Sequence, residues 1–175
     1  AHAAADIWTF RFRSDEPLVW EAGQYVQVEV PHENPDDEGT ERWFTNSAAP
    51  YEGVMQITTR VTGSTFKQAL SRLEPGDRIE LTQDPEGDFT WEETDVPVVF
   101  VAGGIGVTPF HSILKQRHHD GEPLEVTLIE PGAGEPQVGR EIERLGFTKL
   151  TAFALPEFTG DNATHVYLDH AGTTL

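Results

Sequence analysis

The chain has 175 residues, which is enough for one full domain or for two small ones. It contains no cysteine, so disulfides, cysteine-ligated iron–sulfur clusters, thiol nucleophiles and cysteine zinc sites are excluded within these residues. Any one-electron partner would therefore be a separate protein. No apolar run is long enough to span a bilayer and no basic-then-apolar leader opens the chain, so we expect a cytoplasmic protein without a membrane span.

The charge balance is strongly acidic. The chain contains 30 Asp and Glu but only 12 Lys and Arg, which gives a formal net charge of -18, and only three of the twelve are lysines. Such self-repulsion destabilises a compact state at low salt and argues against nucleic acid or anionic membranes as partners. A lysine-poor acidic surface is typical of halophilic proteins, and an ordinary acidic domain is the alternative.

The first ninety residues have the alternating pattern of short β-strands separated by turns. Strands are expected over residues 7–13, 23–30, 43–47, 54–61 and 78–82. Residues 32–39 predict a loop and 49–53 a turn, whereas 66–73 have the apolar spacing of a helix. Short strands at this spacing predict a small antiparallel β-barrel.

The period changes after the acidic segment Glu92–Asp95, which divides a domain of residues 1–94 from a domain of residues 95–175. Strands are expected over residues 98–102, 124–129 and 150–155, and helices over about 108–118 and 138–145. Alternating strands and helices predict a parallel sheet with right-handed crossovers. The unbroken apolar run 98–102 predicts a strand buried on both faces.

Three glycines, Gly103, Gly104 and Gly106, lie between this strand and the following helix. Glycines at such a turn let a ligand approach the backbone, and the helix N-terminus offers unpaired N–H groups to a phosphate. The alternative is a plain tight turn, because these residues do not form the full G-x-G-x-x-G fingerprint.

Two earlier segments carry further candidate groups. In Arg42–Ser47, an arginine can hold a phosphate bidentately, an aromatic ring can cover a flat ring, and the Thr45 hydroxyl can bond a ring nitrogen. The alternative is a strand with core aromatics and a solvated arginine. Gly63-Ser64-Thr65 precedes the helix 66–73 and can bind an anion, cap the helix, or do both.

The order of these motifs resembles the ferredoxin–NADP reductase superfamily, from about Ile7 to Ile129. The series comprises Gly23-Gln-Tyr25, Arg42–Ser47, Gly63-Ser64-Thr65, Gly76-Asp77, Gly87-Asp-Phe89 and Ala102–Pro109. The resemblance implies an antiparallel Greek-key β-barrel that binds FAD, followed by a parallel α/β domain for a nicotinamide nucleotide. It also implies an oxidoreductase that transfers a hydride from NAD(P)H to FAD and passes electrons to a separate acceptor, for which a ferredoxin is one candidate.

The resemblance assigns flavin contacts residue by residue. Arg42 would contact the flavin phosphates, Phe44 would stack on the isoalloxazine, and Thr45 would lie near flavin N5 as a catalytic residue. Other flavin contacts are expected from Trp43, Asn46, Ser47, Thr59, Val61, Gly63, Ser64 and Thr65. The last three would hold the pyrophosphate, which favours FAD over FMN.

The nucleotide contacts follow in the same way. The resemblance implies that Gly103, Gly104 and Gly106 receive the nicotinamide nucleotide. Val107, Thr108 and Pro109 would lie beside the nicotinamide–flavin junction, with Thr108 as the second catalytic residue.

The histidines are not needed for this chemistry, because hydride transfer to a flavin requires no acid–base dyad. His111 could approach a phosphate, but a solvated position on the helix surface is the expected one. His118 and His119 are adjacent and point in different directions, so we expect a helix C-terminus facing the dipole and no metal site.

The chain departs from the family after Ile129. The segment Glu130–Pro136 has no cation to pair a 2′-phosphate, and Glu130 would favour the ribose diol of NAD. The family's Cys-Gly-Pro-like motif has no counterpart, and residues 95–175 are few for its nucleotide domain, which is either reduced or incomplete here. An FAD-binding electron-transfer subunit without its own NAD(P)H activity is therefore the alternative function. The choice between NADH and NADPH and the oligomeric state stay open.

Overall fold

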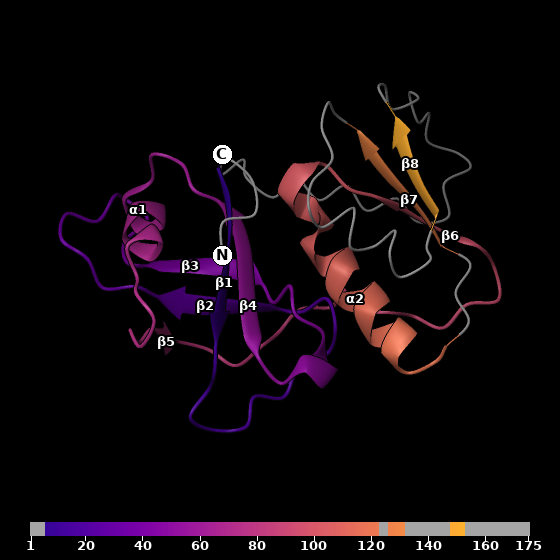
Figure 1. The fold of residues 1–175 in the computed structure, drawn as a ribbon, viewed down its shortest axis with the longest axis horizontal. Helices are drawn as coiled ribbons and strands as arrows, with labels where there is room; N and C mark the ends of the chain where they lie inside the picture. Colours follow the sequence, from indigo (N-terminus) through magenta and orange to yellow (C-terminus); the bar gives the residue numbers. More distant parts are fainter. Residues whose placement is uncertain (1–5, 123–125, 132–147, 153–175) are drawn as a thin grey trace.

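The computed structural model describes residues 6–122, 126–131 and 148–152 (Figure 1). The strands are β1 (Ile7–Phe12), β2 (Tyr25–Glu29), β3 (Glu41–Thr45), β4 (Met55–Arg60), β5 (Glu80–Leu81), β6 (Val98–Val101), β7 (Val126–Pro131) and β8 (Thr148–Ala152). The α-helices are α1 (Thr65–Ser71) and α2 (Thr108–His119), and the short 3-10 helices are η1 (Pro50–Glu52) and η2 (Gly104–Val107).

The five N-terminal strands form two antiparallel sheets. One sheet pairs β1 with β4 and the other has the order β3-β2-β5, and Figure 1 shows β1 and β4 running across the direction of β2 and β3. Inward-facing Val26, Val28 and Ile57 are fully buried between the sheets. Among the described strands no closed barrel forms, so the Greek-key barrel remains a prediction.

Helix α1 closes one side of this core, as its apolar spacing predicts. Phe66 and Leu70 are fully buried, and Ala69 and Leu73 pack against the same cluster. The predicted turn 49–53 is the 3-10 helix η1, which Pro50 begins and which ends at Gly53 in the left-handed region with φ 63°.

The C-terminal strands form the predicted parallel sheet, in the order β6-β7-β8. Helix α2 lies along this sheet (Figure 1), and Phe110 and Leu114 pack with Leu128 of β7 in one buried cluster. The predicted burial of β6 on both faces is wrong at Val99, whose side chain is 54% exposed because α2 covers only the other face. The predicted helix 138–145 lies outside the described residues.

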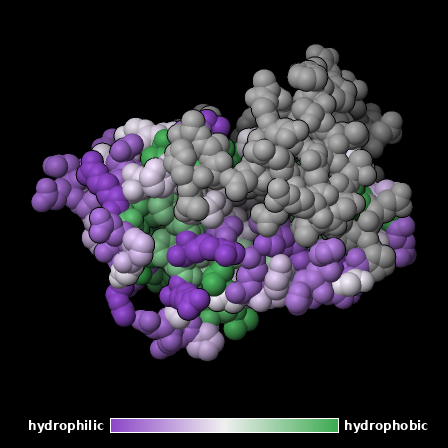
Figure 2. All heavy atoms as spheres, in the orientation of Figure 1, coloured by the Kyte–Doolittle hydropathy of each residue, from purple (hydrophilic) through white to green (hydrophobic). Residues whose placement is uncertain are grey.

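Hydrophilic residues cover much of the face shown in Figure 2, with smaller apolar patches between them. This distribution agrees with the net charge of -18. Within residues 6–122, 126–131 and 148–152, no helix combines the length and the apolar character needed to cross a membrane.

Candidate functional site

Strand β3 distributes the residues of the Arg42–Ser47 motif over two faces. In the antiparallel pair with β2, Phe44 lies opposite Val26 and Arg42 opposite Val28, so both point to the core side. The Phe44 ring stacks on Phe66 of α1 with 5.8 Å between ring centroids. Arg42 and Phe44 therefore share one environment, next to the first turn of α1.

Trp43 and Thr45 lie on the opposite face of β3. Trp43 is 43% exposed and makes an edge-to-face contact with Tyr25, with 5.1 Å between the ring centroids. Tyr25 is also the cross-strand partner of Thr45. The predicted flavin contacts of this motif thus do not all converge on one surface of the strand.

The Arg42 guanidinium is engaged through all three nitrogens by the loop before β3. Nη2 forms an ion pair with the Asp36 carboxylate and Nε lies 2.7 Å from Glu38 Oε2. Nη1 donates to the carbonyls of Glu38, Gly39 and Glu41 at 2.9, 3.0 and 2.7 Å. The side chain is 14% exposed, so the alternative of a solvated arginine is wrong.

Asp36 connects Arg42 to the start of α1. Ser64 Oγ donates to Asp36 Oδ2 at 3.5 Å, and the Asp36 N–H donates to Thr65 Oγ1 at 3.1 Å. The hydrogen bond and the charge of Arg42 hold the pKa of Asp36 below its ordinary value of 3.8, against a smaller opposing effect of burial. A guanidinium and a neighbouring hydroxyl thus already hold one anion here, which is the donor set that a phosphate requires.

This arrangement bears on both interpretations of Gly63-Ser64-Thr65. Ser64 occupies the N-cap position of α1, but its side chain makes no capping hydrogen bond. Both hydroxyls face Asp36 instead, and a Cβ added at Gly63 would meet no atom within 4 Å. Ser64 is therefore at the N-cap position but lacks the expected capping hydrogen bond, and the backbone at Gly63 is open. Anion binding at this helix start stays a prediction.

The other two predicted contacts of this region are carried by β4 and its exit. Thr59 is 4% exposed and pairs with Trp8 across the β1–β4 ladder. The Val61 N–H donates to the Asp6 carbonyl at 2.7 Å. Their backbone leads the chain from the sheet toward Ser64.

Asn46 and Ser47 serve the internal structure at the end of β3. Asn46 Oδ1 accepts from the N–H groups of Gln56 and Ala48 at 2.9 and 3.2 Å. Ser47 Oγ lies 3.0 Å from the Gln56 carbonyl and 2.9 Å from Thr58 Oγ1. Both residues are buried, and their side chains tie β3 to β4, which explains why β3 ends at Thr45 rather than at the predicted residue 47.

The glycine segment forms a tight turn directly before α2. The Gly106 N–H donates to the Gly103 carbonyl at 3.0 Å, and Gly104 has a φ of +55°, which only glycine adopts readily. A Cβ at Gly103 or Gly104 would meet no atom within 4 Å, so this side of the backbone is open to a ligand. Gly106, Val107, Thr108 and Pro109 are buried, so the exposed part of the predicted set is Gly103 and Gly104.

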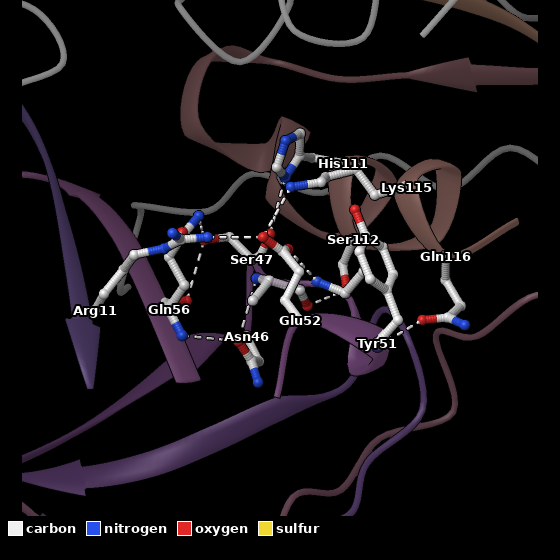
Figure 3. A network of polar contacts seen from close by, with 12 residues as sticks. Arg11, Asn46, Ser47, Tyr51, Glu52, Gln56, His111, Ser112, Lys115 and Gln116 are labelled. Carbon is white, nitrogen blue, oxygen red and sulfur yellow. Dashed lines mark hydrogen bonds and ion pairs between the residues drawn. The ribbon is translucent and has the colours of Figure 1, made fainter. Parts of the chain in front are cut away.

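The loop after β3 and helix α2 meet through a contact that sequence patterns did not predict. His111 Nδ1 donates to the Ser47 carbonyl at 2.8 Å, and Ser112 Oγ donates to the Ala48 carbonyl at 2.7 Å (Figure 3). His111 is 2% exposed, so its predicted solvated position is wrong, because the loop after β3 covers it. The sequence offered His111 only as a phosphate contact or a solvated residue, and Ser112 had no signal beyond its place on a helix.

Comparison with known proteins identifies reductases. No protein-family model matches the chain. The chain is 33% identical over 139 residues to a flavohemoprotein of Halalkalibacterium halodurans, covering 72% of this chain and 33% of that protein. It is 34% identical over 125 residues to ferredoxin–NADP reductase B of Sorangium cellulosum, covering 69% and 49%, respectively. The reductase component 1 of Comamonas terephthalate 1,2-dioxygenase is 29% identical over 132 residues. The chain thus spans about a third to a half of the length of these curated relatives.

Solved structures agree on the fold. The FAD/NAD-binding domain of a Vibrio cholerae nitric oxide dioxygenase superposes with a TM-score of 0.72 at 20% identity, over 99% of this chain and 78% of that one. The Amycolatopsis cytochrome P450 reductase GcoB gives 0.69 at 29% identity, over 86% and 48%. The homologues and structural neighbours of this chain are therefore FAD- and NAD-binding reductase domains of the ferredoxin–NADP reductase type.

Proposed function

We propose that this chain is an FAD-dependent NAD(P)H oxidoreductase that passes electrons to a separate acceptor. When bound, FAD supplies hydride acceptance and release of electrons singly or in pairs. The observation that carries the proposal is the hydrogen bond between His111 and the Ser47 carbonyl, which joins the strand of the flavin motif to the helix of the nucleotide motif. The residues 1–94 would form the flavin domain and 95–175 the nucleotide domain.

The residues of the chain would bind and orient both cofactors. Arg42, with the Ser64 and Thr65 hydroxyls, would hold the diphosphate in the place now taken by Asp36. Two neighbouring hydroxyls beside one guanidinium support FAD over FMN, whose single phosphate needs fewer donors. Phe44 and Thr45 remain the proposed ring contacts.

The nucleotide would lie along the open glycine turn. Gly103 and Gly104 offer exposed backbone at the end of β6, and η2 lies against β4 of the flavin-binding half. Thr108, at the start of α2, is the proposed nicotinamide-side counterpart of Thr45. Both ring systems would be aligned and kept from water, which is the protein's share of such a reaction.

The test is flavin binding followed by anaerobic reduction. Protein purified in molar salt is expected to take up FAD, and its visible flavin band is expected to bleach on mixing with NADH or NADPH. The nucleotide that bleaches faster identifies the natural donor. Failure to take up FAD would contradict the proposal.

A second candidate function is an FAD-binding electron-transfer subunit without NAD(P)H activity. These 175 residues contain no cysteine and hence no Cys-Gly-Pro-like motif, which motivates this candidate. Bound FAD that a chemical reductant bleaches, but that neither nucleotide bleaches, would establish it.

The acceptor and the cellular setting complete the proposal. Two relatives are reductase components, of a terephthalate dioxygenase and of an aromatic O-demethylase, which supports a separate protein acceptor, with a ferredoxin as one candidate. We propose a cytoplasmic protein of a halophile. A net charge of -18 is screened in molar salt, which would also allow an acidic acceptor to approach. The protein is expected to lose structure in dilute buffer and to regain it at molar salt, as followed by circular dichroism.

A further inference from the structure

Helix α2 directs one polar face at the loop that follows β3. The residues of this face recur at helical spacing and are His111, Ser112, Lys115, Gln116 and His119. Gln116 Oε1 accepts from the Tyr51 N–H at 3.0 Å, and the His119 ring stacks on Tyr51 with 4.0 Å between centroids. His111 and Ser112 bond the carbonyls of residues 47 and 48 (Figure 3). The residues of this face therefore all contact residues 47–52.

Glu52 lies at the centre of this contact and receives donors from three elements. Its Oε1 lies 3.0 Å from Lys115 Nζ of α2 and 2.7 Å from Arg11 Nη2 of β1, and its Oε2 accepts from the Ala49 N–H at 2.9 Å. The Glu52 and Lys115 side chains are only 11% and 10% exposed. Separating two opposite charges at this depth is costly, so a displacement of α2 that breaks this ion pair is disfavoured.

The contact is close to both proposed reaction centres along the chain. Helix α2 begins at Thr108, directly after the glycine turn, and the loop begins directly after Thr45. Any slip of α2 on residues 47–52 would therefore move the turn relative to the end of β3. An apolar helix face would hold α2 in place as firmly, but it would tolerate sliding, whereas paired donors and acceptors do not.

We propose that this face of α2 fixes the glycine turn relative to β3, and that Lys115, through Glu52, is the positioning residue of the reductase. The expected effect on hydride transfer rests on the proposed function. The fixed position of α2 relative to β3 does not. Since a misplacement of about 1 Å between reacting groups can cost about 100-fold in rate, loss of this register is expected to slow hydride transfer much more than it weakens binding.

The structural consequence can be measured without a cofactor. The chain has no cysteine, so Val19→Cys and His118→Cys, both exposed, give two unique labelling sites on opposite sides of the contact. Pulsed electron paramagnetic resonance on the doubly spin-labelled protein in molar salt gives the distribution of distances between them. Lys115→Met is expected to broaden this distribution, and Lys115→Arg to restore its width.

The kinetic consequence is measured on the FAD-loaded protein. Lys115→Met is expected to lower the limiting rate of flavin reduction about 10- to 100-fold while the Kd for FAD changes by less than about twofold, because Lys115 is not part of the Arg42 site. Arg78→Met is the matched control, since it removes one positive charge from an exposed pair with Asp15. It is expected to change neither the distances nor the rate.

Two results would overturn the proposal: a Lys115→Met protein with the distance distribution of the parent, or an equal broadening in Arg78→Met. If Lys115→Met does not fold, Glu52→Gln removes the other charge of the same pair and is measured in its place. A parent protein that binds no FAD would contradict the proposed function alone, because the distance measurement still decides whether Lys115 sets the register.

Discussion

The imidazole of His111 and the backbone carbonyl of Ser47 form a buried hydrogen bond of 2.8 Å between residues 64 positions apart in the chain. His111 lies in the first turn of α2, three residues after Thr108, and Ser47 lies two residues after Thr45. The bond therefore fixes which nitrogen carries the proton, because a carbonyl can only accept: Nδ1 is the donor. It also joins the segments that carry two sequence motifs far apart in the chain.

Loss of this donor is expected to destabilise the protein. His111→Leu leaves the buried Ser47 carbonyl without the imidazole donor, which costs about 1–3 kcal/mol of unfolding free energy. Urea denaturation in molar salt, followed by circular dichroism, measures the change. The control is His118→Leu, which alters an exposed histidine at the end of the same helix and is expected to cost less than about 1 kcal/mol. Equal losses in the two variants would contradict the structural role of His111.

The Asp36–Arg42 pair predicts opposite effects of two substitutions on FAD binding. Arg42→Met removes the cation from the proposed diphosphate-binding site and is expected to raise the Kd for FAD about 10- to 100-fold. Asp36→Asn removes a competing anion and is expected to lower the Kd about two- to fivefold. Quenching of flavin fluorescence gives both constants.

A matched control for these variants is Asp37→Asn, which removes one negative charge from the neighbouring position of the same loop. Because molar salt screens charges that are not in contact, this variant is expected to bind FAD as the parent does. Tighter FAD binding by both Asp36→Asn and Asp37→Asn would mean that the overall charge controls the affinity, and not the Asp36 carboxylate in the proposed phosphate site.

Glu52 predicts a specific dependence of stability on pH. Burial raises its pKa, but the Ala49 N–H and the Lys115 ammonium outweigh burial and leave the pKa below the ordinary 4.5. Its contribution to stability is therefore complete above pH 4.5 and is lost as the pH falls through the lowered pKa of the folded state. Glu52→Gln is expected to be less stable than the parent at neutral pH and to lose less stability between about pH 5 and about pH 3. Urea denaturation across this range checks it, and parallel curves would contradict it.

Gly23 predicts a strong steric effect at the contact between the two halves. Its φ is +103°, and a Cβ added there would lie 2.0 Å from the Phe89 carbonyl oxygen and 3.1 Å from Ile113 Cδ1 of α2. Gly23→Ala is thus expected to cost about 2–5 kcal/mol, from backbone strain together with overpacking. Gly53→Ala is the control, because its φ of +63° brings strain but no atom lies within 4 Å. It is expected to cost about 1–2 kcal/mol, and thermal or urea unfolding compares the two.

Local sequence patterns predicted most elements that the structure describes. The alternation over residues 7–13 corresponds to β1, the strand expected over 54–61 corresponds to β4, and the helix expected over about 108–118 corresponds to α2. The order of motifs also predicted the reductase fold that the structural neighbours share. These predictions succeeded because alternation, helical periodicity and turn glycines are local patterns of a few residues, which can be recognised without knowing the rest of the chain.

The sequence by itself determined the period of each element, the excess of acid and the order of the motifs. Only the tertiary structure decided that Arg42 is enclosed by Asp36 and Glu38, that Phe44 stacks on Phe66, and that His111 is buried. The physical reason is the range of the interactions involved. Whether a polar side chain on a helix meets water or a carbonyl depends on which distant segment packs against it, and here that segment is the loop between β3 and β4.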